Sequence, residues 1–440
     1  FRHHAYAAFE GYLGRFARRA RLAVSYQQHH QRDRFDQPLS HSYWTGLDQV
    51  HTIGLAARAI TARFRPRPSL SFELIYGADT YLDLIASAAS QHYTDTPLYT
   101  DRPRGNYLDG STYLAGGAFL DGELRIGHDD AAHLVTLRAG ARLGWFRAIA
   151  PADPETAAPA LSQSWVPVVG HIGIEYQPLP ALALLANIDH SFRAPNLEDL
   201  TGLVLISSGF TFGNPALQPE RATTFEAGAR VRSRIVVADL WLFESLLTDA
   251  IVPASRNRGD CPAAEPSCAT AWSLLQPANA PSLAEVRGVE GGIKATLPRG
   301  FALRATFAYA WGEGPRLGVL ERIPGLSIIG DRIPLTAIPP VHGTVEASWA
   351  HKAGMSAGAA LRWAGPQDRL SYADIKNTAI PKYGTPGYAV VDLRVGLRLR
   401  ERIKAGLVVE NLLDTPYRTH GSAVNGPGRG VLLTVDAGLP

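Results

Sequence analysis

The turns of this chain alternate between short and long from one end to the other. Short polar turns are found at residues 65–69, 127–131, 178–181, 297–300, 351–354 and 400–402. Long stretches rich in Gly, Pro, Asp and Ser separate them, at residues 90–110, 195–222, 253–283, 314–339 and 365–387. An antiparallel barrel in an outer membrane sorts its turns in this way, because its periplasmic turns are short and its extracellular loops are long. The pattern therefore predicts an all-β transmembrane barrel.

The segments between the turns alternate apolar and polar side chains. In 388–400 the apolar positions Val391, Leu393 and Val395 alternate with Asp392 and Arg394. Successive side chains of a strand point to opposite faces, so one face is apolar and the other polar. We count roughly 17 such strands, too many for side chains alone to fill the interior, so we expect the polar face inside and the apolar face outside.

Composition limits the remaining classes. No run of about 18 apolar residues occurs, so no transmembrane helix is predicted. The formal net charge of +3 is too close to neutral to indicate a nucleic-acid partner. The 42 glycines and 31 prolines fit a chain with many turns, because strand-like segments fill the spaces between them.

The direction of the strands predicts a truncated barrel. The last strand, 430–439, follows a long connection and should run toward the periplasm, and counting back gives the same direction for the first strand, 5–14. A complete bacterial single-chain barrel has an even number of strands with both ends periplasmic. The odd count means either that one strand was missed or that the chain lacks its N-terminal part. The chain also begins at Phe1 without a visible signal peptide. We therefore expect residues 1–440 to be one barrel domain that lacks its N-terminal part.

The two cysteines of the chain lie close together. Cys261 and Cys268 stand in the segment CPAAEPSC, within one long connection. Two cysteines that close a single loop predict a local disulfide in an oxidising compartment, with two free thiols as the alternative. A metal site is less favoured, because no histidine stands nearby to complete a ligand set.

The second half of the chain carries a family resemblance. The segment 191–220 reads SFRAPNLEDLTG and, after an interval, GNPALQPE, which resembles the FRAP and NPNL boxes of TonB-dependent outer-membrane receptors. The fragments LLTDAI at 246–251, VRGVEGG at 286–292 and ENLLDTPYR at 410–418 follow in the family's order. The resemblance implies a 22-stranded barrel. About five strands, the plug domain and the TonB box would then lie upstream of this chain.

The resemblance also implies a function. Members of this family import scarce ligands, such as ferric siderophores, haem or cobalamin, and TonB drives the ligand past the plug. An iron chelate is the leading substrate class, and we expect TonB, the ligand and outer-membrane lipid as partners, with no cofactor and no nucleic acid. The chain departs from the family in ending at Gly438-Leu439-Pro440 rather than in an aromatic residue, and no plug is visible in it.

Five residues are candidates for ligand contact: Arg193, Asn196, Asn214, His29 and His30. The first three belong to the two boxes, where a structural role at the outer rim is the favoured alternative. His29 and His30 are adjacent in a strand and so point to opposite faces, which makes a poor bidentate site. In haem receptors of the family a histidine lies between the two boxes, and here 196–213 contains none, which weakens the haem alternative.

Inward arginines could also contact an anionic ligand; they are Arg142, Arg230, Arg394 and Arg398. Pairing with acids of the plug or barrel is favoured, and the candidates are Glu226, Asp239, Asp392 and Glu410. No spacing of a nucleophile and a base predicts catalysis, so we expect no enzyme, with an outer-membrane hydrolase as a remote alternative. A passive porin is a closer alternative, because porins have about 16–18 strands. The two boxes and the long loops favour the receptor.

Overall fold

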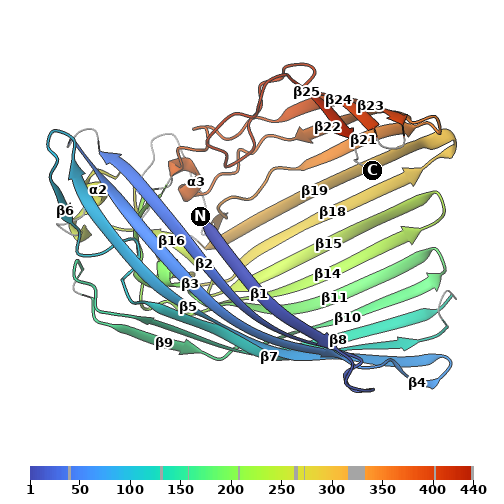
Figure 1. Ribbon diagram of the computed structural model, residues 1–440, viewed down its shortest axis with the longest axis horizontal. Helices are drawn as coiled ribbons and strands as arrows, with labels where there is room; N and C mark the ends of the chain where they lie inside the picture. The colour runs from blue at the N-terminus through green and yellow to red at the C-terminus, as the bar shows by residue number, and fades with distance from the viewer. Residues whose placement is uncertain are drawn as a thin grey trace.

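The computed structural model describes residues 1–37, 41–128, 132–156, 158–206, 209–261, 266–271, 273–315, 332–400 and 403–437. A single curved antiparallel wall dominates it (Figure 1). Its 17 long strands pair consecutively, which confirms the predicted number: β1 (Arg2–Gly11), β2 (Arg19–Gln37), β3 (Ser42–Ile60), β5 (Leu70–Tyr93), β7 (Thr112–Ile126), β8 (Leu134–Ala150), β10 (Val168–Leu179), β11 (Leu182–Arg193), β14 (Glu220–Arg232), β15 (Val236–Thr248), β18 (Ala284–Thr296), β19 (Phe301–Pro315), β21 (His342–Ala350), β22 (Met355–Ala364), β23 (Tyr388–Arg400), β24 (Ile403–Glu410) and β25 (Gly430–Ala437).

The turns are sorted to the two ends as predicted. Short turns lie at the right of Figure 1 and long connections at the left. At the long end only four residues, 38–41, connect β2 to β3. The strands around this connection are long instead, since β2 and β3 have 19 residues each and β5 has 24. These strands therefore extend past their neighbours. The first strand begins three residues earlier than predicted and still runs toward the short turns, as β25 does. Parts of the predicted turns at 127–131, 314–339 and 400–402 lie outside the described residues.

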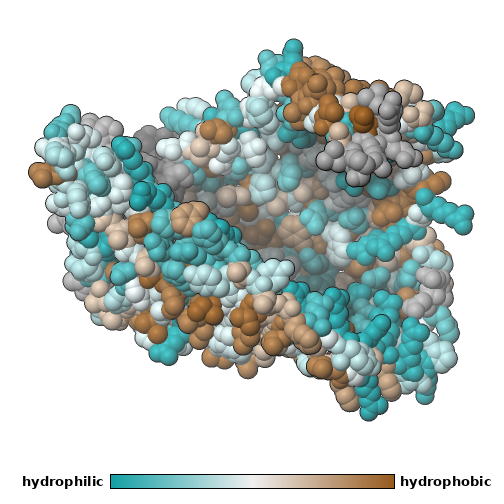
Figure 2. Space-filling view, viewed as in Figure 1, coloured by the Kyte–Doolittle hydropathy of each residue, from teal (hydrophilic) through white to brown (hydrophobic). Residues whose placement is uncertain are grey.

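The two faces of the wall differ as the alternation predicts. Leu393, Val395 and Leu397 are exposed on the outer face of β23, while Arg362 donates to Asp392 on the inner face at 3.0 Å. Figure 2 shows hydrophobic residues along the lower margin of the wall, between hydrophilic surfaces at both ends, and a hollow interior. No helix within the described ranges is long and apolar enough to cross a membrane.

On the inner face, charged side chains pair across glycines. Arg142 of β8 makes a bidentate ion pair with Asp79 of β5, at 2.7 and 2.8 Å. The strand between them is β7, which places Gly117 under the guanidinium: a Cβ at Gly117 would lie 2.6 Å from Arg142 Cζ. The missing side chain allows the arginine to lie flat against the wall.

The same arrangement occurs twice more. Asp121 of β7 lies 3.0 Å from His171 of β10, and a Cβ at the intervening Gly140 of β8 would lie 2.6 Å from the Asp121 carboxylate. Arg394 of β23 lies 3.3 Å from Glu346 of β21, across Gly358 of β22. Of the four inward arginines, Arg142 and Arg394 therefore pair with barrel acids, although with Asp79 and Glu346 rather than with the acids expected from the sequence. Arg230 lies opposite Asp239 in the ladder.

Further elements lie outside this ladder. The short strands β4 (Phe64–Arg67), β6 (Tyr99–Asp101), β9 (Leu161–Trp165) and β20 (Arg332–Pro334) extend the wall. A separate sheet, which the sequence did not predict, joins β12 (Leu203–Ile206), β13 (Gly209–Phe212), β17 (Leu274–Asn279) and β16 (Ile251–Ser255). The helices are short: α1 (Leu197–Thr201), η2 (Arg258–Asp260), α2 (Pro266–Thr270), η3 (Pro298–Gly300) and α3 (Tyr372–Lys376). Within the described part of the chain, β1 pairs only with β2 and β25 only with β24.

The bridging glycines make a stability prediction. Gly117→Ala should displace Arg142 from Asp79 and lower the free energy of unfolding by about 1 kcal/mol, the usual size of a partly exposed charged pair. Gly292→Ala is the matched control, because a Cβ there would meet no atom closer than 3.7 Å. Urea unfolding of both variants in lipid measures the difference. Equal losses of unfolding free energy in the two variants would show that Gly117 has no role in the pair of Arg142 and Asp79.

Candidate functional site

Three long connections, 94–111, 151–167 and 194–219, pack together at the outer end of the wall. Their common apolar core contains Leu108, Leu197, Leu200 and Leu217, each at most 4% exposed, over Ile85 of β5. Tyr113 of β7 donates its hydroxyl to the carbonyl of Pro195 at 3.2 Å and so fixes the third connection to the wall. We call this group of connections the loop cluster. Because its core is apolar and buried, it holds a defined shape at the mouth of the barrel.

A buried arginine links all three connections. Arg104 is 4% exposed, and its guanidinium donates to Asp153 at 2.6 Å and to the carbonyl of Thr201, at the end of α1, at 2.7 Å. It also donates to the carbonyls of Gly105 and Asn106 in its own connection, both at 3.1 Å. Five donors in a planar group suit a junction of this kind.

The Asp153 carboxylate is ionised in this setting. Burial raises its pKa, but the Arg104 guanidinium and the amides of Glu155 and Thr156 outweigh burial, so the pKa lies below its usual range. Burial lowers the pKa of Arg104 against the opposing effect of Asp153. The guanidinium nevertheless stays protonated, because its ordinary pKa is above about 12. The two groups therefore form a buried ion pair.

The predicted residues of the first box organise the start of α1. Asn196 is the N-cap: its side chain accepts a hydrogen bond from the Asp199 amide at 2.7 Å, and the Asp199 carboxylate accepts from the Asn196 amide at 3.1 Å. Arg193 lies 2.9 Å from Asp199 and 3.2 Å from Glu220. Glu220 in turn accepts from the amide of Ile251 at 2.8 Å. The side chains of Arg193 and Asn196 thus both make contacts that hold the connection 194–219 in place.

The predicted residue of the second box has a similar environment. The Asn214 amide side chain donates to the carbonyl of Pro277 in β17 at 2.9 Å and accepts from the Ala216 amide at 3.0 Å. Its backbone amide donates to the carbonyl of Asp199 at 2.7 Å. The structure therefore brings Arg193, Asn196 and Asn214 together around Asp199.

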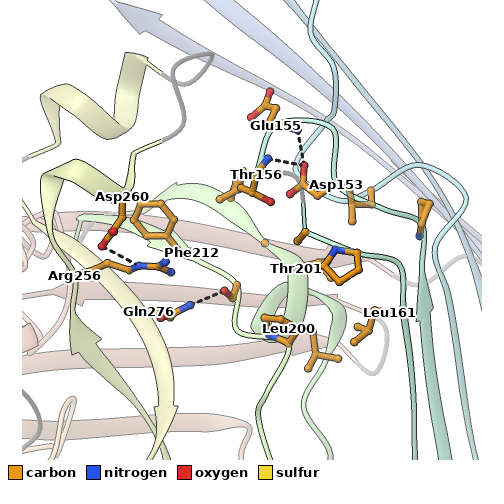
Figure 3. Close-up of a pocket in the computed structure, with 18 residues that line it drawn as sticks. Asp153, Glu155, Thr156, Leu161, Leu200, Thr201, Phe212, Arg256, Asp260 and Gln276 are labelled. Carbon is orange, nitrogen blue, oxygen red and sulfur yellow. Dashed lines mark hydrogen bonds and ion pairs between the residues drawn. The ribbon is translucent and has the colours of Figure 1, made fainter.

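A cavity of about 430 Å³ opens beside the loop cluster (Figure 3). Leu161 and Leu200 form one side, and Asp153, Glu155 and Thr156 another. Arg256, which directly follows β16, and Phe212 of β13 face them. The Arg256 guanidinium lies 4.8 Å from the centre of the Phe212 ring and 3.2 Å from Asp260. The mixture of apolar, acidic and basic groups suits a small polar ligand.

The predicted disulfide adjoins this cavity, because Cys261 directly follows Asp260 and Cys268 packs with Phe212, and both Asp260 and Phe212 line it. Cys261 and Cys268 are joined, and Cys268 is fully buried with Phe210, Phe212 and Leu274 of the separate sheet. The bond therefore ties η2 to α2 and covers the core of that sheet.

The predicted histidines lie on β2, outside the three connections of the loop cluster. In the ladder His29 of β2 lies opposite Val50 of β3, whose side chain packs against the apolar core of the loop cluster. His29 is therefore on the inner face of β2. His30 stacks its ring on Phe1 at 4.5 Å and lies on the outer face. As the alternation predicted, they do not converge on one site. The described residues contain no group of three or more His, Cys, Asp or Glu side chains that could hold a metal ion.

Comparison with known proteins fits this geometry. The family model described as TonB dependent receptor-like, beta-barrel, matches residues 3–412. The chain belongs to the TonB-dependent receptor family. Its members are transporters and receptors of the outer membrane, and the chain is a barrel of that membrane. No curated protein matches the sequence closely enough to count as a relative.

Solved structures of such receptors share the fold. The copper transporter OprC superposes with a TM-score of 0.78 at 20% identity, covering 99% of this chain and 65% of that one. The siderophore receptor PiuA from Acinetobacter baumannii gives 0.71 at 15% identity, with 99% and 64% covered. The Serratia marcescens hemophore receptor HasR gives 0.67 at 17% identity, with 99% and 71% covered. This receptor chain thus spans roughly two thirds of the length of these proteins.

The buried ion pair of Arg104 and Asp153 gives a prediction. Arg104→Met should leave Asp153 buried without its cation and destabilise the loop cluster by about 3–5 kcal/mol. Amide hydrogen exchange over 151–156 and 197–203 should then accelerate. Arg256→Met is the matched control, because its exposed pair with Asp260 is worth at most about 1 kcal/mol. The double variant Arg104→Met, Asp153→Leu should recover most of the protection, and failure to recover would contradict the charge argument.

The role of Asn196 can be separated from ligand contact. Serine is as good an N-cap as asparagine, whereas alanine costs about 1 kcal/mol. A capping role predicts that Asn196→Ser keeps the hydrogen-exchange protection of α1 and that Asn196→Ala loses it. A ligand contact would instead make both substitutions weaken ligand binding to the same extent, with α1 protected in the serine variant.

Proposed function

We propose that this chain is the barrel portion of an active outer-membrane importer whose substrate is a ferric siderophore or another iron chelate. The observation that carries the proposal is the loop cluster: long connections at one end only, packed around Arg104 and Leu200 beside a cavity at the mouth of a wide barrel. A passive channel has no need of a shaped and buried mouth. The family membership supports the same reading.

The choice of an iron chelate has support from two structural neighbours, the siderophore receptor PiuA and the ferric citrate transporter FecA. Other neighbours are a copper transporter and a hemophore receptor. Haem or cobalamin, which other members of the family import, is the second candidate class. The absence of histidine from 196–213 disfavours haem ligation at that position. Arg193, Asn196 and Asn214 act in this proposal by shaping the mouth.

We also propose that the intact protein supplies further strands between the free edges of β1 and β25, together with a plug that engages TonB. The two unpaired edges support this, since backbone groups within a bilayer need partners. The family's 22 strands leave about five for that space.

Transport assays test the proposal. A strain that lacks the intact receptor should lose uptake of radiolabelled iron from at least one of three probes, ferric citrate, a ferric hydroxamate and a ferric catecholate, and complementation should restore it. A protonophore or deletion of TonB should abolish the restored uptake. Uptake that persists with the protonophore or without TonB would support the passive porin. If the strain loses only haem or cobalamin uptake, the receptor imports that second class of ligand instead.

A further inference from the structure

Two neighbouring short turns at the same end of the barrel each combine at least two arginines with exposed aromatic side chains. Residues 12–18 read YLGRFAR and residues 61–69 read TARFRPRPS. Neither contains an acidic residue, and both contain the order Arg-Phe. By contrast, the turn at 127–133 reads GHDDAAH. We call the two turns together the arginine–aromatic patch.

The apolar side chains of the patch are unusually exposed. Tyr12, Leu13, Phe16 and Phe64 are each 65–71% exposed. Phe64 pairs with Phe72, which continues the apolar outer face of β5. Aromatic side chains collect at the boundary between hydrocarbon and water in membrane barrels. The patch is therefore continuous with the face of the barrel that contacts lipid.

The turn between β1 and β2 folds onto that outer face. The hydroxyl of Tyr76 in β5 donates to the carbonyl of Phe16 at 3.0 Å, and the amide of Ala62 donates to the carbonyl of Arg15 at 2.7 Å. Tyr76 faces outward, because its partner in the ladder is the exposed Leu120. Figure 1 shows the dark-blue turn hanging below the strand ends. It leans toward β3 and β5, away from the free edge of β1, so strands added at that edge would leave it uncovered.

The charge of the patch is strongly positive. Arg15, Arg18, Arg65 and Arg67 are all exposed. The Arg15 guanidinium lies 4.9 Å from the centre of the Phe16 ring, which holds a cation beside an apolar surface. The closest acid along the chain, Glu10, is already paired with Arg19 at 2.9 Å. The two turns therefore offer guanidinium groups at the depth of the lipid headgroups.

We propose that the arginine–aromatic patch is a docking site for anionic phospholipid headgroups of the periplasmic leaflet. The guanidinium fork matches the geometry of a phosphate, and the aromatic rings seat in the boundary beneath it. The site would fix the depth and tilt of the barrel at β1–β5. It depends on the location of the chain in the outer membrane and is independent of the transported ligand.

Native mass spectrometry of the intact receptor with added phosphatidylglycerol or phosphatidylethanolamine tests the site. The wild type should prefer phosphatidylglycerol. The variant Arg15→Gln, Arg18→Gln, Arg67→Gln should lose at least about tenfold of that preference, since each arginine near an anionic surface contributes roughly fivefold. The control Arg234→Gln, Arg299→Gln, Lys352→Gln removes three exposed cations from separate turns at the same end and should change it by less than about twofold.

A second variant, Phe16→Ser with Phe64→Ser, keeps the charges and should make lipid binding fully salt-sensitive. Thermal melting of each variant in detergent verifies that the barrel is folded. Equal losses in the patch and control variants would overturn the proposal in favour of a general charge effect. If the wild type shows no preference between the two lipids, the lipid proposal is also overturned. The patch would then be a candidate binding surface for a soluble periplasmic partner.

Discussion

The whole architecture depends on one requirement, that every backbone amide and carbonyl within a bilayer finds a partner in the protein. The ladder from β1 to β25 meets it by pairing each long strand with the next in sequence. Irregular backbone is then possible only above and below the hydrocarbon. This explains why the helices α1, α2 and α3 and the separate sheet all occur in the long connections, and why the opposite end keeps short turns.

The same requirement sets the chemistry of the two faces. Charged side chains must point inward over the span of the membrane, where they need partners of their own. Pairs such as Arg142 with Asp79 reach across an intervening strand, and Gly117 provides the space. At the outer end, where water is available on both sides, a cluster of connections can instead bury an ion pair such as that of Arg104 and Asp153. Each charge is thus neutralised by the means that its depth in the membrane allows.

Much of the fold could be predicted from the sequence, because strand number, direction and faces depend on local alternation and turn length. The cysteines could be paired because they lie only seven positions apart in one connection. Even the cap of α1 is readable in Asn196-Leu197-Glu198-Asp199, a capping signature. The sequence gives no such signal for Arg104, whose partner Asp153 is 49 residues away in another irregular connection. The separate sheet was missed for a similar reason: β13 pairs in parallel with β17, and more than 60 residues separate Phe210 from Leu274.

The glycine-bridged pairs also bear on how the wall is assembled. Each pair ties a strand to its second neighbour rather than to its first, so it forms only when three strands are aligned at once. A slip of one residue in the middle strand would replace Gly117 with Gly116 or Ala118 beneath the guanidinium and turn the apolar face of that strand inward. The bridges therefore depend on the correct register of three strands, because a middle strand that is misaligned by one residue would turn its own inward acids, Asp121 and Glu123, toward hydrocarbon.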